Sequence, residues 1–93
     1  MKAIWHNMVI AESTHTIVIG RQHYFPPETV KREVLRPSAM HTVSPLEGEA
    51  SYYSINVDGH VNLHAAWYYP HPSPEAAQIR YYITFREDIS ITE

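Results

Sequence analysis

The stretch that decides the fold is Ser51–Pro74, SYYSINVDGHVNLHAAWYYPHPSP. At its centre lies Asp58-Gly59, with apolar and aromatic residues on both sides. An Asp-Gly pair favours a type I′ turn of two residues, because both positions need a positive φ. The stretch therefore predicts a β-hairpin, with Ser51–Val57 as one strand and a second strand that continues through Ala65–Tyr69.

A two-residue turn also fixes the register of the hairpin. The predicted pairs are Val57 with His60, Ile55 with Asn62, and Tyr53 with His64. The three prolines that follow, Pro70, Pro72 and Pro74, cannot donate ladder hydrogen bonds, so the second strand is expected to end before them.

The remainder of the chain also indicates short strands. Segments rich in β-branched or apolar residues are Lys2–His6, Met8–Ala11, Thr14–Ile19, Gln22–Phe25, Tyr81–Phe85 and Ile89–Ile91. Short helices are expected at Glu28–Leu35 and after Ser73-Pro74-Glu75, and a loop at Ala39–Gly48. We expect a mainly β, sandwich-like or tent-like domain of about eight mostly antiparallel strands with one or two short helices.

Composition limits the possible functions. The 93 residues suit one domain, residues 1–93, and the net charge of -3 without a basic face argues against nucleic acid as a partner. No cysteine is present, which excludes thiolate catalysis and cysteine-ligated zinc. No run approaches the ~18 apolar residues that span a bilayer, so no membrane is expected as a partner and a cytoplasmic location is the default.

Several motifs together resemble the small bacterial family named domain of unknown function 427. They are Tyr24-Phe25-Pro26-Pro27, Arg36-Pro37-Ser38, His41-Thr42, Gly48–Tyr53, Val57-Asp58-Gly59, Ala65–Pro70 and Tyr82–Phe85, in this order and spacing. The resemblance covers nearly the whole chain and implies a compact β-rich fold and a soluble bacterial protein, with no established reaction. Family members sometimes carry a nucleotidyltransferase label, but this chain lacks a Gly-Ser followed by paired aspartates.

One loop departs from the family pattern. Where the family usually has Cys-Pro-Trp-Lys-Gly, this chain has Ser44-Pro45-Leu46-Glu47-Gly48. The thiol, the indole and the cation are absent, whereas the proline and glycine that shape the loop remain. A family function that depends on that cysteine or lysine is not expected here.

Histidines and tyrosines are the candidate functional residues. Seven histidines are spread along the chain without the spacing of a three-ligand metal site, so no metal or other cofactor is expected. Each of the Tyr-Tyr pairs sends one ring to each face of a strand, so one ring of each pair can line a site. The predicted ligand-binding cleft, for a small molecule or a protein partner, consists of Tyr24, His41, Tyr53, Trp67 and Tyr69.

Two alternatives remain open at this point. A small enzyme could use His41 or Asp58 as its catalytic acid or base, and would need a deep pocket around that group. A structural module could instead form a homo-oligomer through its outward tyrosines, and would show a flat aromatic patch.

Overall fold

The computed structural model describes residues 1–45 and 47–93, and within them the chain forms nine β-strands and three 3-10 helices. The strands are β1 Lys2–Trp5, β2 Met8–Glu12, β3 Ile17–Ile19, β4 Gln22–Tyr24, β5 Leu35–Ser44, β6 Gly48–Val57, β7 His60–Tyr68, β8 Thr84–Phe85 and β9 Ser90–Thr92. The 3-10 helices are η1 Pro27–Thr29, η2 Arg32–Val34 and η3 Pro74–Ile79. None of the helices in the described ranges is long and apolar enough to cross a bilayer.

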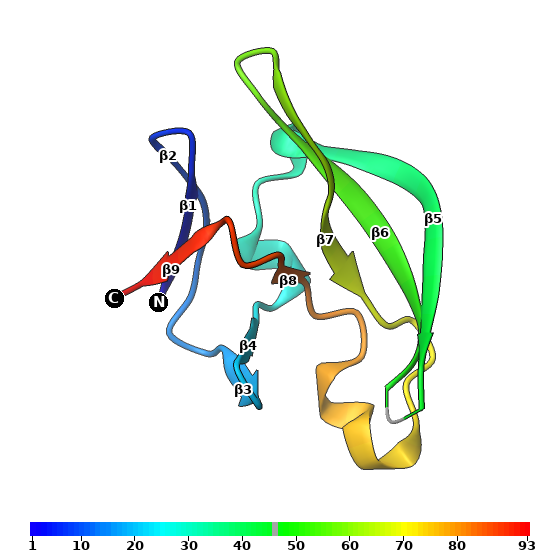
Figure 1. The fold of residues 1–93 in the computed structure, drawn as a ribbon. Coiled ribbons are helices and arrows are strands. Elements are labelled where there is room, and N and C mark those ends of the chain that lie inside the picture. The colour runs from blue at the N-terminus through cyan, green and yellow to red at the C-terminus, as the bar shows by residue number, and fades with distance from the viewer. Residues whose placement is uncertain (46) are drawn as a thin grey trace.

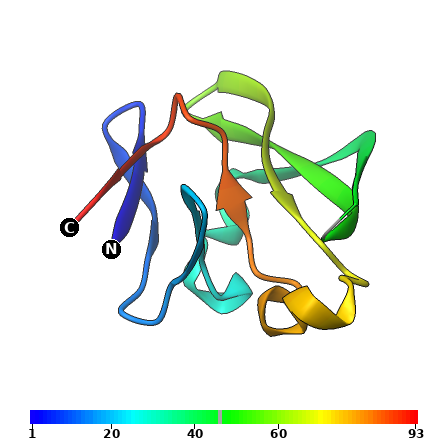
Figure 2. The same cartoon turned by 60° about the horizontal axis from the view of Figure 1, so that its bottom comes forward.

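The strands form three antiparallel sheets, with the orders β5-β6-β7-β8, β2-β1-β9 and β3-β4. The long strands β5, β6 and β7 lie on one side of the molecule and the β2-β1-β9 sheet on the other (Figure 1). The two chain ends lie side by side because Lys2 pairs with Thr92. A second view shows η3 below the end of β7 that carries the chain toward β8 (Figure 2). The prediction of a mainly β domain with mostly antiparallel strands is confirmed.

The β6–β7 hairpin has the predicted turn. Asp58 and Gly59 have φ values of 50° and 83°, which is the positive pair that a type I′ turn needs. Val57 pairs with His60 as predicted.

Beyond the first pairs, the predicted register is wrong. Tyr53 pairs with Ala66 and not with His64, because a bulge in β7 interrupts the ladder between Tyr53 and Ile55. His64 has a positive φ of 56°, its backbone N–H donates to Ser54 Oγ at 3.1 Å, and its ring bonds to Ser38. A side-chain hydroxyl thus takes the place of a ladder acceptor, and the bulge turns His64 out of register.

The predicted loop over Ala39–Gly48 is also wrong for most of its length. Its first part belongs to β5, which pairs with β6 along the edge of the four-stranded sheet. Most β5 side chains are exposed, so the sequence shows no apolar alternation. Pro37 is compatible with this strand because an edge position leaves one side of the backbone without a ladder partner. Residue 46, within the predicted loop, lies outside the described residues.

The helix predicted for Glu28–Leu35 is replaced by two single 3-10 turns, η1 and η2. Between them Val30 is extended and forms a bridge with Ala11, and the Lys31 N–H donates to the Ile10 carbonyl oxygen at 2.9 Å. These tertiary hydrogen bonds outweigh the weak helical preference of so short a segment. The segment after Ser73 starts at Pro74 as predicted, but it forms a 3-10 helix that is kinked at Ala76.

Two clusters of buried side chains pack on opposite faces of the four-stranded sheet. Tyr53 packs against the first cluster and its neighbour Tyr52 against the second, as the alternation of a strand requires. The first cluster includes Ile10, Phe25, Ile55, Val57, Ala66, Ile83 and Phe85. The second consists of Tyr24, Ala50, Tyr69, Ala76 and Ile79. The sheet therefore presents two different aromatic faces.

Candidate functional site

A groove lies on the face of the sheet that carries Tyr53. It encloses about 390 Å³, within the roughly 300–1,000 Å³ typical of small-molecule sites. Its lining residues are Pro27, Arg32, Tyr53, Tyr68, Tyr81 and Ile83, which we call the tyrosine groove. They come from η1 and η2, from the middle of β6 and the end of β7, and from the segment before β8. Residues far apart in the sequence thus meet at one concave surface.

Three tyrosine rings run in series along this groove. Tyr53 and Tyr68 have ring centroids 5.3 Å apart and planes inclined by 28°. Tyr68 and Tyr81 follow at 6.3 Å and 29°. Near-parallel rings at these distances are the favoured offset-stacked arrangement of aromatic side chains. Tyr81 is the most exposed of the three, at 45%. A planar apolar group can therefore stack on the Tyr81 ring in the same offset arrangement.

The groove also carries positive charge. Burial raises the pKa of the Tyr53 hydroxyl, and Tyr68 raises it further by its charge and by a hydrogen bond, whereas the Arg32 charge lowers it. Within residues 1–45 and 47–93 one ion pair is present, between Arg86 and Asp88, so no described carboxylate neutralises Arg32. Arg32 is therefore available to bind an anion.

Tyr81 has an unusual backbone. Its φ is 65°, in the left-handed region that residues with a Cβ atom rarely adopt. The turn is held by hydrogen bonds from the Tyr81 N–H to the Tyr69 carbonyl oxygen at 3.1 Å and from the Tyr82 N–H to the Ile79 carbonyl oxygen at 2.9 Å. The guanidinium carbon of Arg80 lies 5.2 Å from the centroid of the Tyr81 ring. Strained residues that persist in this way cluster at functional sites.

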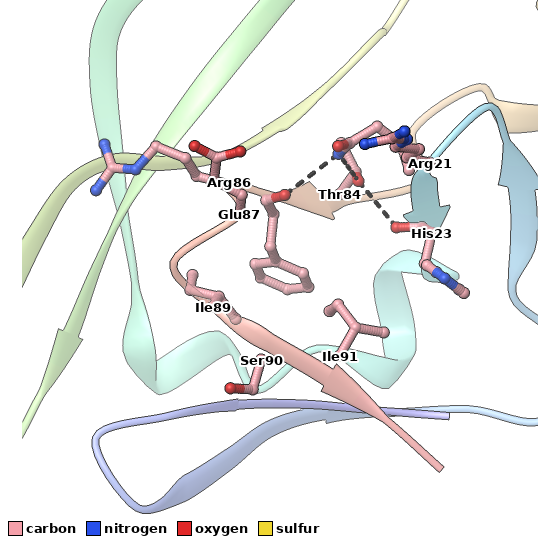
Figure 3. A pocket seen from close by; sticks show the side chains of 10 residues that line it. Arg21, His23, Thr84, Arg86, Glu87, Ile89, Ser90 and Ile91 are labelled. Atoms are coloured by element: carbon pink, nitrogen blue, oxygen red, sulfur yellow. Dashed lines mark hydrogen bonds between the residues drawn. The ribbon is translucent and has the colours of Figure 1, made fainter.

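A second cavity, of about 460 Å³, lies between β4, β8 and β9. Figure 3 shows Arg21 and His23 on one side of it, Arg86 and Glu87 on the other, and Ile89 and Ile91 below.

Three of the polar side chains around this second cavity, Gln22, Thr84 and Arg86, are held by hydrogen bonds. Gln22 Nε2 donates to Thr84 Oγ1 at 2.8 Å and to the Phe85 carbonyl oxygen at 3.2 Å, and Thr84 Oγ1 donates to the His23 carbonyl oxygen at 2.8 Å. The Arg86 guanidinium donates to the Asp88 carboxylate and to a backbone carbonyl oxygen of β7. His23 Nδ1 is the one buried side-chain polar atom of the described residues without a hydrogen-bond partner. The bonds of Gln22 and Thr84 tie β4 and β8 together along this cavity.

Three of the five predicted cleft residues meet, but on the other face of the sheet. Tyr24 and Tyr69 are 2% and 7% exposed and belong to the second buried cluster, against which Trp67 packs. Burial, Tyr69 and Glu47 raise the pKa of Tyr24 far above its usual value. Burial and the Glu47 charge likewise raise the pKa of Tyr69, whereas the Trp67 indole lowers it. Both tyrosines therefore feel the charge of Glu47, which this chain has in place of the family's lysine.

The other two predicted cleft residues lie apart from these three. Tyr53 lines the tyrosine groove. His41 is exposed on the edge strand β5, where its Nδ1 lies 3.2 Å from the Ala50 carbonyl oxygen. The prediction placed Tyr53 and Trp67 in one cleft, but Trp67 pairs with Tyr52 and packs on the opposite face of the sheet from Tyr53.

The two residues proposed for catalysis line neither described cavity. Asp58 is exposed at the tip of the β6–β7 hairpin, and His41 lies on the sheet edge. In the part of the chain that the structure describes, no group of three or more histidine, aspartate or glutamate side chains is arranged to hold a metal ion.

Sequence reasoning missed Arg32, Tyr68 and Tyr81 as groove residues. The Tyr-Tyr pairs gave a usable signal, because one ring of each pair must leave the core. Nothing in the local sequence places Arg32 beside them, since that contact depends on how the η1–η2 segment packs.

The fold and the groove define a small antiparallel β domain with a groove lined by tyrosine rings and Arg32. Residues 1–92 match the family described as a domain of unknown function, DUF427, and the chain belongs to that family. This confirms the resemblance seen in the sequence motifs. No curated protein matches the chain.

Proposed function

We propose that the protein is a small-molecule-binding domain whose ligand is a planar aromatic anion held in the tyrosine groove. The observation that carries the proposal is the stacked series Tyr53, Tyr68 and Tyr81 beside the unpaired Arg32. A planar ring can extend this series by stacking, and a carboxylate or phosphate on the ligand can accept hydrogen bonds from the guanidinium.

The hydroxyls of Tyr53 and Tyr68 add polar selectivity. Both lie at the groove wall, where a hydroxyl or carbonyl of the ligand can form a hydrogen bond with them. Pro27 and Ile83 supply apolar contacts. The proposed ligand therefore has one flat apolar ring, one anionic group and a volume below the roughly 390 Å³ of the groove. The family resemblance implies a bacterial protein, and a cytoplasmic location would put the groove among free metabolites.

The enzyme alternative has less support, because neither His41 nor Asp58 lines a cavity. The homo-oligomer alternative depends on a flat aromatic patch, and the outward tyrosines instead line a concave groove. Sedimentation at micromolar concentration separates this alternative from the proposal, because a dimer that covers Tyr81 would compete with the ligand.

A thermal-shift screen of aromatic carboxylates and nucleoside monophosphates tests the proposal. Hits are then measured by calorimetry on wild type, Arg32→Gln and Tyr53→Phe. We expect both variants to fold and to bind more weakly, Arg32→Gln by about tenfold or more because a charged hydrogen bond contributes roughly 1.5–3 kcal/mol.

Two matched variants serve as controls. Arg21→Gln removes the same charge from the second cavity, and Tyr52→Phe removes a hydroxyl from the opposite face of the sheet. Both should bind as wild type does. If Arg21→Gln weakens binding and Arg32→Gln does not, the ligand occupies the second cavity and the proposal is wrong.

A further inference from the structure

We propose that His6 and His60 form a binding site for a divalent transition-metal ion. Their ring centroids are 3.8 Å apart, with the planes inclined by 36°. His6 lies in the turn between β1 and β2, and His60 is the first residue of β7. Sequence spacing could not reveal this pair, because the two residues belong to different hairpins.

The two side chains are close enough to share one ion. Imidazole nitrogens bind zinc at about 2.0–2.1 Å, so two rings that share an ion must bring their nitrogens to roughly 3 Å. The observed rings are in stacking contact, so side-chain rotation must first move them apart and turn one nitrogen of each toward a common ion. Both side chains are exposed, so an ion and its remaining water ligands have direct access.

Two tight turns fix the backbone from which both side chains extend. His6 and Asn7 have φ values of 52° and 64°, and Asp58 and Gly59 have 50° and 83°, so each histidine belongs to or follows a tight turn of left-handed residues. The Trp5 ring packs 5.5 Å from His6. A histidine fixed in this conformation is uncommon, and such residues are enriched at ligand sites.

Two imidazole ligands select the kind of metal ion that the site binds. Imidazole ligands favour nickel, copper and zinc over magnesium and calcium. No third histidine or carboxylate completes a cluster among the described residues, so water fills the other coordination positions. The ion therefore exchanges freely and is lost on dialysis, and while bound it links the β1–β2 hairpin to the β6–β7 hairpin.

Calorimetric titration of the full chain with nickel sulfate tests the site. We expect one ion per chain, and a loss of affinity of at least about tenfold in both His6→Asn and His60→Asn, because each removes one of two linked ligands. Asparagine tolerates the left-handed turn at position 6, so the variant should fold. His15→Asn and His71→Asn are matched controls at exposed histidines and should bind as wild type does.

A second measurement locates the ion without substitutions. Paramagnetic broadening by copper in amide spectra of wild type should be strongest around residues 5–8 and 59–61. The proposal is overturned if wild type binds no nickel, if both ligand variants bind as tightly as wild type, or if broadening centres on another histidine.

Discussion

Replacing Tyr81 by glycine and by alanine separates the two roles of this residue, its ring in the groove and its strained backbone. A residue with a Cβ atom in the left-handed region costs about 1–2 kcal/mol. Glycine avoids that cost at φ 65°. However, glycine loses more conformational freedom on folding than alanine, which costs about 0.5–1 kcal/mol. Tyr81→Gly should therefore be more stable than Tyr81→Ala by about 0.5–1 kcal/mol.

Both variants lose the ring. The aromatic contact with Tyr68 contributes about 0.5–1.5 kcal/mol and the Arg80 contact at an exposed site about 0.5–1 kcal/mol. Tyr81→Ala should therefore be less stable than wild type by roughly 1–2 kcal/mol, and Tyr81→Gly should lie between the two.

Urea unfolding followed by fluorescence gives the free energies of unfolding, and the slope with urea should be the same for all variants. Tyr82→Gly and Tyr82→Ala are the control pair, because the backbone of Tyr82 is not in the left-handed region. At this position the glycine variant should be less stable than the alanine variant. If Tyr81→Ala equals or exceeds Tyr81→Gly in stability, the left-handed turn is absent in solution and the argument from strain is refuted.

Three further substitutions have defined outcomes. Gly48→Ala should cost at least ~1 kcal/mol of unfolding free energy, because φ is 99° and the new Cβ would lie 3.0 Å from a backbone carbonyl oxygen; urea unfolding measures it. Tyr53→Phe should cost less than about 1.5 kcal/mol, since it removes only a hydroxyl at the groove wall and keeps the ring that packs on Tyr68, and a loss above 4 kcal/mol would contradict this position of the hydroxyl. Arg86 lowers the pKa of Asp88 to about 2, so this carboxylate stabilises the fold above its unfolded pKa of about 3.9 and loses that effect as the pH falls toward 2. Because both groups are nearly half exposed, Asp88→Asn should cost less than ~1 kcal/mol at pH 7 and almost nothing at pH 2, as acid titration of unfolding would show.

Local chemistry made part of the fold predictable. The turn at Asp58-Gly59 needs two positive φ values, and Asp followed by Gly is a residue pair that favours them. Most other strands were indicated by β-branched and aromatic residues. The β7 bulge was not predictable, because it depends on a hydroxyl of the neighbouring strand, Ser54, and on Ser38 in β5.

The candidate site was only partly predictable for the same reason. The sequence indicated tyrosines as candidate functional residues, and Tyr53 does line the groove. It grouped Trp67 with Tyr53 in one cleft because their segments are adjacent in the chain, but the two side chains pack against different faces of the sheet. Arg32 and Tyr81 reach the groove only through tertiary packing, which no local pattern encodes.

The central claim, that the tyrosine groove binds the ligand, is tested most directly by amide spectra of wild type titrated with the ligand that gives the largest thermal shift. The account predicts that the shifted resonances belong to residues 27–32, 53, 68 and 81–83. Shifts confined to residues 21–23 and 84–91, or no ligand of this class binding at all, would contradict it.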